Sequence, residues 1–416
     1  MTKDLQEKHA RLRFSVVLVS AALGAYCRAD MVPPLRYTAT DLGSPPESKS
    51  QRNYVEASAI NNAGQVVGVA QSGFGNLTEP FLWTPAVSGG NSGTMLGLGL
   101  LPDPNFGWGG VNSINDAGQV AGYCCNANYS QAFIWTPSKP NGTTGIMTGL
   151  PNPPGTAYGG RVASGINNVG QVVGVDNAGG HGLVQPSAGT GVFLYQPDSS
   201  NSLSGTVHEI SDANTYAPRI NSHGQMLFNN ALFTPSSARD GSYVQTLVAS
   251  AGTATGLNER GQVIGYMTVG DGTVSYLWTP DTPNGPTGHM TTIDAGGESL
   301  IAAAINNAGQ VVGIKSPYGK SAWSLFLWDP NAGIVDLNST LTNTLGDWTL
   351  TNAVGINDMD EIVAIGVERV SYAGGKGVAE IRHSFLLTPD VPEPALELAG
   401  TMIVVLAMVP RLRRAA

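Results

Sequence analysis

Short apolar runs alternate with turn residues along the whole chain, and one combination of the two recurs seven times. Each copy has a stretch of small side chains ending in Ile or Leu, then Asn, a tight turn that Gly closes in six copies, and a second apolar run such as Gln-Val-Val-Gly. The copies begin at Ile60, Ile114, Ile166, Ile220, Leu257, Ile305 and Ile356. A period near 50 residues without helical spacing of the apolar positions is typical of a β-propeller or a related array.

The first copy predicts four strands. Residues 57–60 form a strand of small side chains, and residues 61–64 a tight turn in which Asn bonds the backbone and Gly supplies a positive φ. Residues 65–70 return as a second strand, residues 80–85 form an aromatic third strand stopped by Pro, and residues 94–98 form a fourth. Four short strands in about 50 residues is the pattern of one propeller blade.

The side chains within each repeat predict where its strands lie in the ring. Small residues fit where strands converge on a central channel, so we expect the first strand of each repeat to be innermost. One aromatic side chain recurs on the third strand of six repeats, and we expect it to wedge between neighbouring blades. These aromatics are Trp83, Trp135, Tyr195, Phe233, Trp278 and Trp328.

The seventh repeat lacks a fourth strand, because the chain after residues 383–389 runs directly into its C-terminal segment. Ahead of the first repeat, residues 36–43 have the pattern and the Leu-Gly ending of a fourth strand. Pairing of this segment beside residues 384–387 would complete the ring and leave no open edge. The sequence therefore predicts an all-β fold in residues 30–390, a seven-bladed β-propeller closed by an N-terminal strand.

The first 29 residues are typical of a secretory signal peptide. Lys3, Lys8, Arg11 and Arg13 precede an apolar run over residues 14–26, and small residues follow at a predicted cleavage site after Ala29. We therefore expect signal peptidase to remove residues 1–29 during export.

The C-terminal segment, residues 391–416, has three parts. A Pro-Glu-Pro motif is followed by an apolar stretch over residues 395–409 and then by a basic tail. This order resembles the PEP-CTERM sorting signal of Gram-negative bacteria. The resemblance implies a C-terminal membrane helix with transient inner-membrane anchoring, recognition by an exosortase, and an exported protein at the cell surface or outside the cell. The residues that carry it are Pro392, Glu393, Pro394, Arg411, Arg413 and Arg414.

The repeat phrases resemble the bacterial extracellular HAF repeat, named for a His-Ala-Phe triplet on the third strand. Gln131-Ala132-Phe133 and His383-Ser384-Phe385 come nearest to that triplet, and the resemblance covers residues 54–389. It implies the architecture and an exported setting, and it defines no catalytic residue.

Charge and motifs narrow the classes of function. The net charge is −9, and residues 30–410 alone carry −15, which argues against nucleic acid as a partner. No metal, phosphate-loop or nucleophile motif is present, so we expect no cofactor, no metal and no catalytic residue. The vicinal Cys124 and Cys125 are expected to be small strand residues. Acidic residues gather at Asp358, Asp360 and Glu361, which we expect to be solvated turn residues, with weak calcium binding as the alternative.

Aromatic residues just ahead of the innermost strands are the candidate binding residues. Rings on the rim of the channel could stack on sugars or cap the blades beneath them. The leading hypothesis is a monomeric, non-enzymatic surface or matrix propeller that contacts exopolysaccharide. A glycan lyase or hydrolase with its site at the channel mouth, and a protein-interaction scaffold, are the alternatives. The candidate binding residues are Tyr54, Trp108, Tyr158, Tyr216 and Trp348.

Overall fold

The structure is a computed structural model, in which residues Arg36–Pro389 form one compact unit. The sorting segments predicted at residues 1–29 and 391–416, with the expected membrane helix, lie outside the described residues. Among the residues with described structure, none belongs to a helix with the length and apolar character that a membrane crossing needs. The described residues are 35–45, 54–71, 78–102, 107–125, 130–151, 160–176, 191–211, 215, 217–236, 241–320, 323–371 and 378–390.

In the described residues the unit consists of 28 strands in seven antiparallel sheets of four strands each, and each sheet is one blade. Blade one is β2 (Val55–Ile60), β3 (Val66–Gln71), β4 (Thr78–Pro85) and β5 (Gly93–Gly97); blade two is β6 (Trp108–Ile114), β7 (Val120–Cys125), β8 (Ser130–Pro137) and β9 (Gly145–Gly149). Blade three is β10 (Val162–Ile166), β11 (Val172–Asp176), β12 (Gly191–Pro197) and β13 (Gly205–Ser211); blade four is β14 (Arg219–Ile220), β15 (Met226–Phe228), β16 (Ala231–Pro235) and β17 (Tyr243–Leu247). Blade five is β18 (Thr253–Leu257), β19 (Val263–Val269), β20 (Gly272–Pro280) and β21 (Gly288–Ile293); blade six is β22 (Glu298–Ile305), β23 (Val311–Pro317), β24 (Ser324–Asp329) and β25 (Gly333–Asp336). Blade seven is β26 (Thr349–Ile356), β27 (Ile362–Ser371), β28 (Val378–Pro389) and β1 (Tyr37–Asp41).

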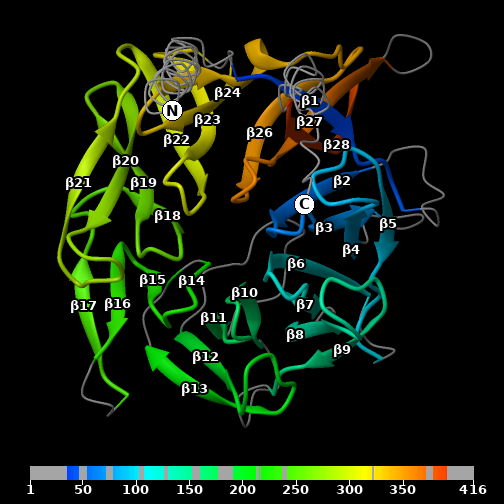
Figure 1. Cartoon of the computed structure of the whole chain (residues 1–416), viewed down its shortest axis with the longest axis vertical. Helices are drawn as coiled ribbons and strands as arrows, with labels where there is room; N and C mark the ends of the chain where they lie inside the picture. The colour runs from blue at the N-terminus through cyan, green and yellow to red at the C-terminus, as the bar shows by residue number, and fades with distance from the viewer. Residues whose placement is uncertain are drawn as a thin grey trace, which may run out of the picture. The chain divides into compact units, whose positions relative to one another are not determined.

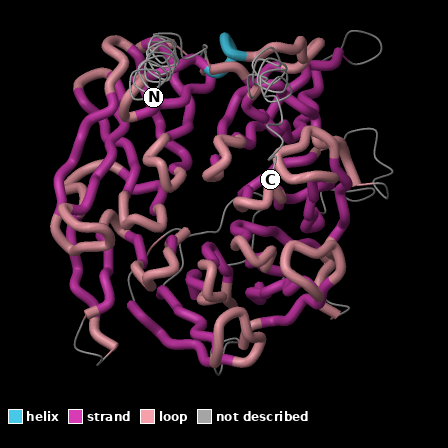
Figure 2. The backbone as a smooth tube through the Cα atoms, viewed as in Figure 1, coloured by secondary structure: helices cyan, strands magenta, loops and turns pink. Residues whose placement is uncertain are grey.

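The seven blades are arranged as a ring (Figure 1), and residues of five of them line a hollow at its centre, which we call the channel. The first strand of each repeat is innermost, and it lies against the innermost strands of both neighbouring blades around the full circle. The tube in Figure 2 is almost entirely strand and loop, and the short helical segment in it is η1 (Leu337–Thr340) between blades six and seven. The predicted seven-bladed propeller is confirmed.

The ring closes between its two ends, as predicted. β1 pairs with β28 in antiparallel register, with Thr40 opposite Leu386 and Asp41 opposite Phe385. The segment after η1 adds a second attachment, because Asn343 bonds both backbone groups of Ala39, at 2.9 and 2.8 Å. The N-terminal strand is therefore the outer strand of the last blade.

The recurring Asn of the repeat links each blade to the next. Its side-chain Nδ2 donates to the backbone oxygen of the corresponding Asn in the following blade, and the bonds measure 2.8 to 3.2 Å. The seventh bond runs from Asn357 back to Asn61, so the chain of hydrogen bonds is circular. A buried amide must find such partners, which explains why each copy keeps the Asn. The members of this cycle are Asn61, Asn115, Asn167, Asn221, Asn258, Asn306 and Asn357.

A second cycle runs through the residue that follows each Asn. Its backbone N–H donates to a side-chain oxygen of the equivalent residue in the next blade at 2.8 to 3.1 Å. Asp358 belongs to this cycle, where it accepts from Asn307 N. Glu361 corrects the sequence prediction, because its side chain is buried and bonded to Asn357 at 2.6 Å rather than solvated. Among the described residues, no group of three or more His, Cys, Asp or Glu is placed to hold a metal ion.

The hydrophobic core lies between the blades. Trp83, for example, packs with Val363 and Leu386 of blade seven, and Trp278 packs with Leu227 and Leu232 of blade four. Each of the six predicted aromatics belongs to a cluster that contains residues of two neighbouring blades. The prediction that they wedge between blades is confirmed.

Candidate functional site: the channel cavity

A β-bulge in the innermost strands shapes the wall of the channel. In six blades the pairing of the first two strands skips a residue, once in five of them and twice in blade seven, and each skipped residue has no opposite partner. The Gly of the second strand is required there, since a Cβ on Gly68 would lie 2.2 Å from Glu56 O. Bulges re-aim side chains, and four of the skipped residues line the cavity described next. These four are Ser58, Asn112, Ala303 and Val354.

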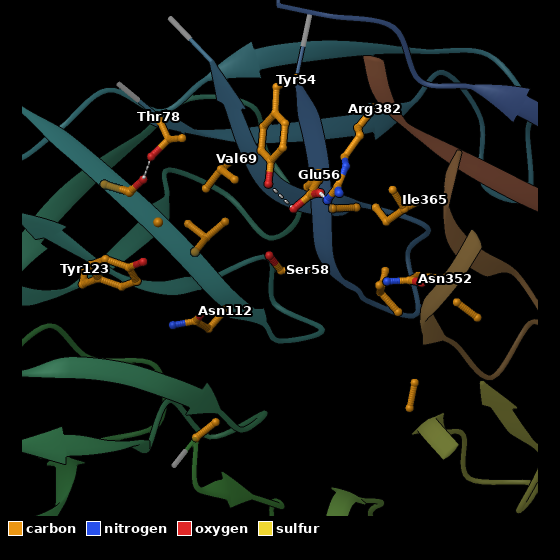
Figure 3. Close-up of a pocket in the computed structure, with 18 of the residues that line it drawn as sticks. Tyr54, Glu56, Ser58, Val69, Thr78, Asn112, Tyr123, Asn352, Ile365 and Arg382 are labelled. Carbon is orange, nitrogen blue, oxygen red and sulfur yellow. Dashed lines mark hydrogen bonds and ion pairs between the residues drawn. The ribbon is translucent and has the colours of Figure 1, made fainter. Parts of the chain in front are cut away.

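The channel widens into a cavity of about 540 Å³ on the side where the innermost strands begin. Its wall comes from five blades, and Figure 3 shows Asn112 and Asn352 extending from different strands below a cluster of polar side chains. Thr78 Oγ1 donates to Gly109 O at 3.0 Å and joins blades one and two at the wall. The volume lies within the range of roughly 300 to 1,000 Å³ that is usual for small-molecule sites.

Three ionisable side chains form one cluster in this wall. Arg382 Nη1 donates to Glu56 Oε1 at 2.7 Å, and the Tyr54 hydroxyl donates to the other oxygen of Glu56 (Figure 3). Burial, followed by the hydrogen bond to Glu56, raises the pKa of Tyr54 above its usual value. The hydrogen bond to Glu56 likewise raises the pKa of Arg382. Tyr54 therefore stays protonated and Arg382 stays charged, and both donate to the Glu56 carboxyl group.

Tyr123 and Arg219 are the other ionisable groups in the cavity wall. Burial raises the pKa of Tyr123 to about 12, so it is a neutral phenol. Arg219 lies on β14 and also lines a second, smaller hollow of about 220 Å³, at the ends of the innermost strands. It therefore borders both hollows.

The predicted rim aromatics occupy different environments. Tyr54 lines the cavity, as described above. Trp108 is the first residue of β6 and is half-buried. Trp348 is stacked on His383, with ring centroids 4.5 Å apart, and its edge meets Phe385 at 5.5 Å. Tyr158 and Tyr216 lie outside the described residues, as do the residues of the sorting motif.

A pair of carboxylates lies elsewhere, in blade three. Buried Arg161 donates from Nε to Asp176 at 2.7 Å and from Nη2 to Glu209, and its guanidinium lies 5.1 Å from the ring centre of Phe193. The hydrogen bond that protonated Glu209 donates to Asp176 raises the pKa of Glu209 to about 7, with burial as the next cause. None of these residues lines the channel cavity.

Of the cavity residues described above, the sequence prediction named Tyr54 but not Glu56, Arg382 or Arg219. Glu56 and Arg382 are 326 residues apart, so only the ring closure brings them together. The sequence did contain a signal that could have identified Arg219. It is a large cation at a position where the other repeats have Ala, Ser or Gly.

No protein-family model matches this sequence, and no curated protein matches it either. Several solved structures are similar over most of the chain. The aldose sugar dehydrogenase of Streptomyces coelicolor, in its PQQ-bound form, is 11% identical with a TM-score of 0.33, over 86% of this chain and 100% of that one. An α-L-arabinofuranosidase of Podospora anserina, in complex with cellotriose, is 12% identical with a TM-score of 0.36, over 86% of this chain and 98% of that one. The Trypanosoma rangeli sialidase, in complex with sialic acid, is 12% identical with a TM-score of 0.36, over 91% of this chain and 62% of that one. Similarities this distant leave the activity of the present chain to be argued from its own residues.

Proposed function

We propose that this protein is an exported, non-enzymatic propeller that binds a saccharide in its channel cavity. The observation that carries the proposal is the cavity of about 540 Å³, whose wall presents hydrogen-bonding side chains from several blades. Hydroxyl groups of a sugar are both donors and acceptors. Carboxylate, guanidinium, amide and phenol groups in the wall match both roles. The polar groups that matter most are Tyr54, Glu56, Ser58, Asn112, Asn352 and Arg382.

The fixed geometry of these groups supports binding. The Glu56–Arg382 pair holds Tyr54 in place, and the bulges of β2 and β6 aim Ser58 and Asn112 at the channel. Groups that are already held in position lose little conformational entropy when a ligand binds. The exopolysaccharide of a bacterial surface matrix is the ligand source we propose.

The experiment is a glycan array probed with the purified full-length protein. We expect a hit whose signal falls at least tenfold in Asn112→Ala or Asn352→Ala, since each change removes a hydrogen-bonding group from the wall. Asn91→Ala, at an exposed position between β4 and β5, is the matched control and should bind as the unaltered protein does. Binding that survives both wall substitutions would reject the cavity as the site.

Export is part of the proposal and rests on the sequence alone. The Pro-Glu-Pro motif at residues 392–394 and the Arg tail support membership of the PEP-CTERM class, and the turn phrases support the HAF class. Signal peptidase and an exosortase are the processing partners proposed. Intact mass of the exported protein should show loss of residues 1–29 and of the segment beyond Pro394. Detection of residues 411–414 in the extracellular form would reject exosortase processing.

A hydrolytic function is the second candidate, and the carboxylate pair in blade three favours it. A general acid at neutral pH needs a carboxyl group with a raised pKa, and the pKa of Glu209 is raised to about 7 beside Asp176. Release of reducing sugar from a glycan hit, abolished in Glu209→Gln and in Asp176→Asn, would support this candidate. Equal release by the unaltered protein and both variants would reject it.

A further inference from the structure

Arg219 breaks the side-chain pattern of the innermost strands. It occupies the position immediately before the Ile or Leu that begins each repeat, and the Asn cycle fixes the alignment of this position across the ring. The other six blades have only small residues there. These are Ala59, Ser113, Gly165, Gly256, Ala304 and Gly355. Among the seven innermost strands, only that of blade four has a long cation at this position.

The guanidinium of Arg219 is only partly used by the protein. Its Nη1 donates to Ala217 O at 2.9 Å, and among the described residues no carboxylate lies within ion-pair distance of it. Arg161, Arg369 and Arg382 each have a carboxylate partner. Arginine has five N–H donors in a planar fork. Among the described residues only one of those of Arg219 has a protein acceptor, and the side chain lines the channel cavity.

The acidic side chains of the smaller hollow already accept other hydrogen bonds. Asp116, Glu259 and Asp358 line the smaller hollow that Arg219 also reaches. Their carboxylates accept backbone N–H groups in the second cycle, at 2.8 to 2.9 Å. Arg219 is half-buried, and burial lowers its pKa. A cation in such surroundings is costly without a counter-charge.

The charge of the cavity contrasts with that of the molecule. Three charged residues line the cavity, and Glu56 is already paired with Arg382 at 2.7 Å. One positive charge from Arg219 therefore remains, inside a chain whose net charge is −9. A local positive site in an acidic protein selects an anionic group, since the acidic surroundings repel anions elsewhere.

We propose that Arg219 binds the carboxylate of an acidic saccharide, a uronic acid, held in the channel cavity. This inference rests on the proposed saccharide binding and adds the class of sugar. The flat fork of a guanidinium matches a carboxylate with two parallel hydrogen bonds. The amide and hydroxyl groups of the wall then bind the sugar ring, while Arg219 binds its carboxylate.

The test compares two probes by isothermal titration calorimetry with the full-length protein. The probes are a disaccharide that ends in glucuronic acid and its counterpart that ends in glucose. We expect the acidic probe to bind about 10- to 100-fold more tightly, the range for hydrogen bonds to charged groups. Arg219→Met should remove this preference and leave the affinity for the neutral probe unchanged.

Arg369→Met is the matched control, because it removes one positive charge from an exposed side chain outside the cavity. It should keep the preference for the acidic probe.

Melting temperatures show whether each variant folds. If Arg219→Met does not fold, Arg219→Lys is the replacement variant, because lysine keeps the positive charge but lacks the planar guanidinium. The preference for the acidic probe is then expected to fall several-fold. In the unaltered protein the preference should also shrink as sodium chloride is raised.

The outcomes separate the two proposals. Equal, measurable binding of both probes by the unaltered protein would overturn the role of Arg219 and leave saccharide binding intact. A preference that persists in Arg219→Met would overturn it as well. A disaccharide that ends in glucose 6-sulfate serves as a second anionic probe. If it binds as tightly as the uronic acid probe, Arg219 recognises any anionic group, and the proposal that the ligand is a uronic acid is rejected. Binding of no probe would overturn both the inference and the proposed function.

Discussion

Glu361 occupies a position where the other six repeats have Gln. In each of those repeats the Gln carbonyl accepts the Asn amide, and its Nε2 donates to a third-strand side chain, as from Gln119 to Thr136 at 3.0 Å. In the last repeat Glu361 accepts from Asn357 at 2.6 Å, but its other oxygen and the hydroxyl of Thr388 have no partner. Glu361→Gln is therefore expected to stabilise the ring at its closing blade.

The magnitude follows from the bonds at stake. The substitution supplies the missing donor to Thr388 and removes a buried group without a partner. One hydrogen bond contributes about 1 kcal/mol, and an unsatisfied buried group costs about 1–3 kcal/mol. We expect a gain of about 1–3 kcal/mol in the free energy of unfolding at pH 7. The reverse change in blade two, Gln119→Glu, should destabilise by a similar amount, because Gln119 Nε2 also donates to Asn201 O at 3.1 Å.

The effect should depend on pH. Burial raises the pKa of Glu361, so between the unfolded and the folded pKa the folded protein binds more protons. The unaltered protein therefore loses stability as pH rises through that window, and Glu361→Gln does not. Denaturant unfolding from pH 4 to pH 8 should show a difference near zero at pH 4 that grows with pH. A difference that is constant with pH, or a less stable variant at pH 7, would refute this account of Glu361.

Three further predictions test the packing. Deleting residues 35–43 should destabilise the whole ring and expose the last blade to limited proteolysis, because this segment supplies its outer strand; proteolysis confined to the new N-terminus would contradict the closure. Trp83→Ala should cost about 3–5 kcal/mol in chemical unfolding through cavity formation, and Trp348→Ala, which is half-buried, clearly less; equal costs would refute the distinction between wedge and cap. Burial raises the pKa of Cys124 to about 11 and of Cys125 to about 12, so neither should react with iodoacetamide at pH 8 until the protein unfolds; rapid labelling of the folded protein would contradict their burial.

Much of the fold was predictable because the repeats constrain one another. The small first strand and the wedge position of Trp83 or Trp278 recur with the Asn turn, and seven copies of one pattern specify one arrangement. The closing strand was predictable from the Leu-Gly ending that residues 36–43 share with fourth strands. The reach of each Asn into the next blade was not predicted, since a turn Asn usually bonds its own backbone.

The candidate site was only partly predictable. The bulges that present Ser58 and Asn112 to the channel depend on the pairing of two strands, which the sequence pattern does not specify. Glu56 and Arg382 meet only after ring closure, and no local signal marks either residue. Glu361 looked solvated because it follows two aspartates, but its position in the repeat buries it. Comparison of equivalent positions across the repeats was the signal that would have identified both Glu361 and Arg219.

The most direct test of the central claim is a crystal structure of the protein with the saccharide that binds it most tightly. The account predicts electron density for the sugar in the channel cavity, with hydrogen bonds to Asn112 and Asn352 and with Arg219 facing an acidic group. Density for the sugar on the outer strands, or over Trp108 and Trp348 with the channel left to solvent, would contradict it.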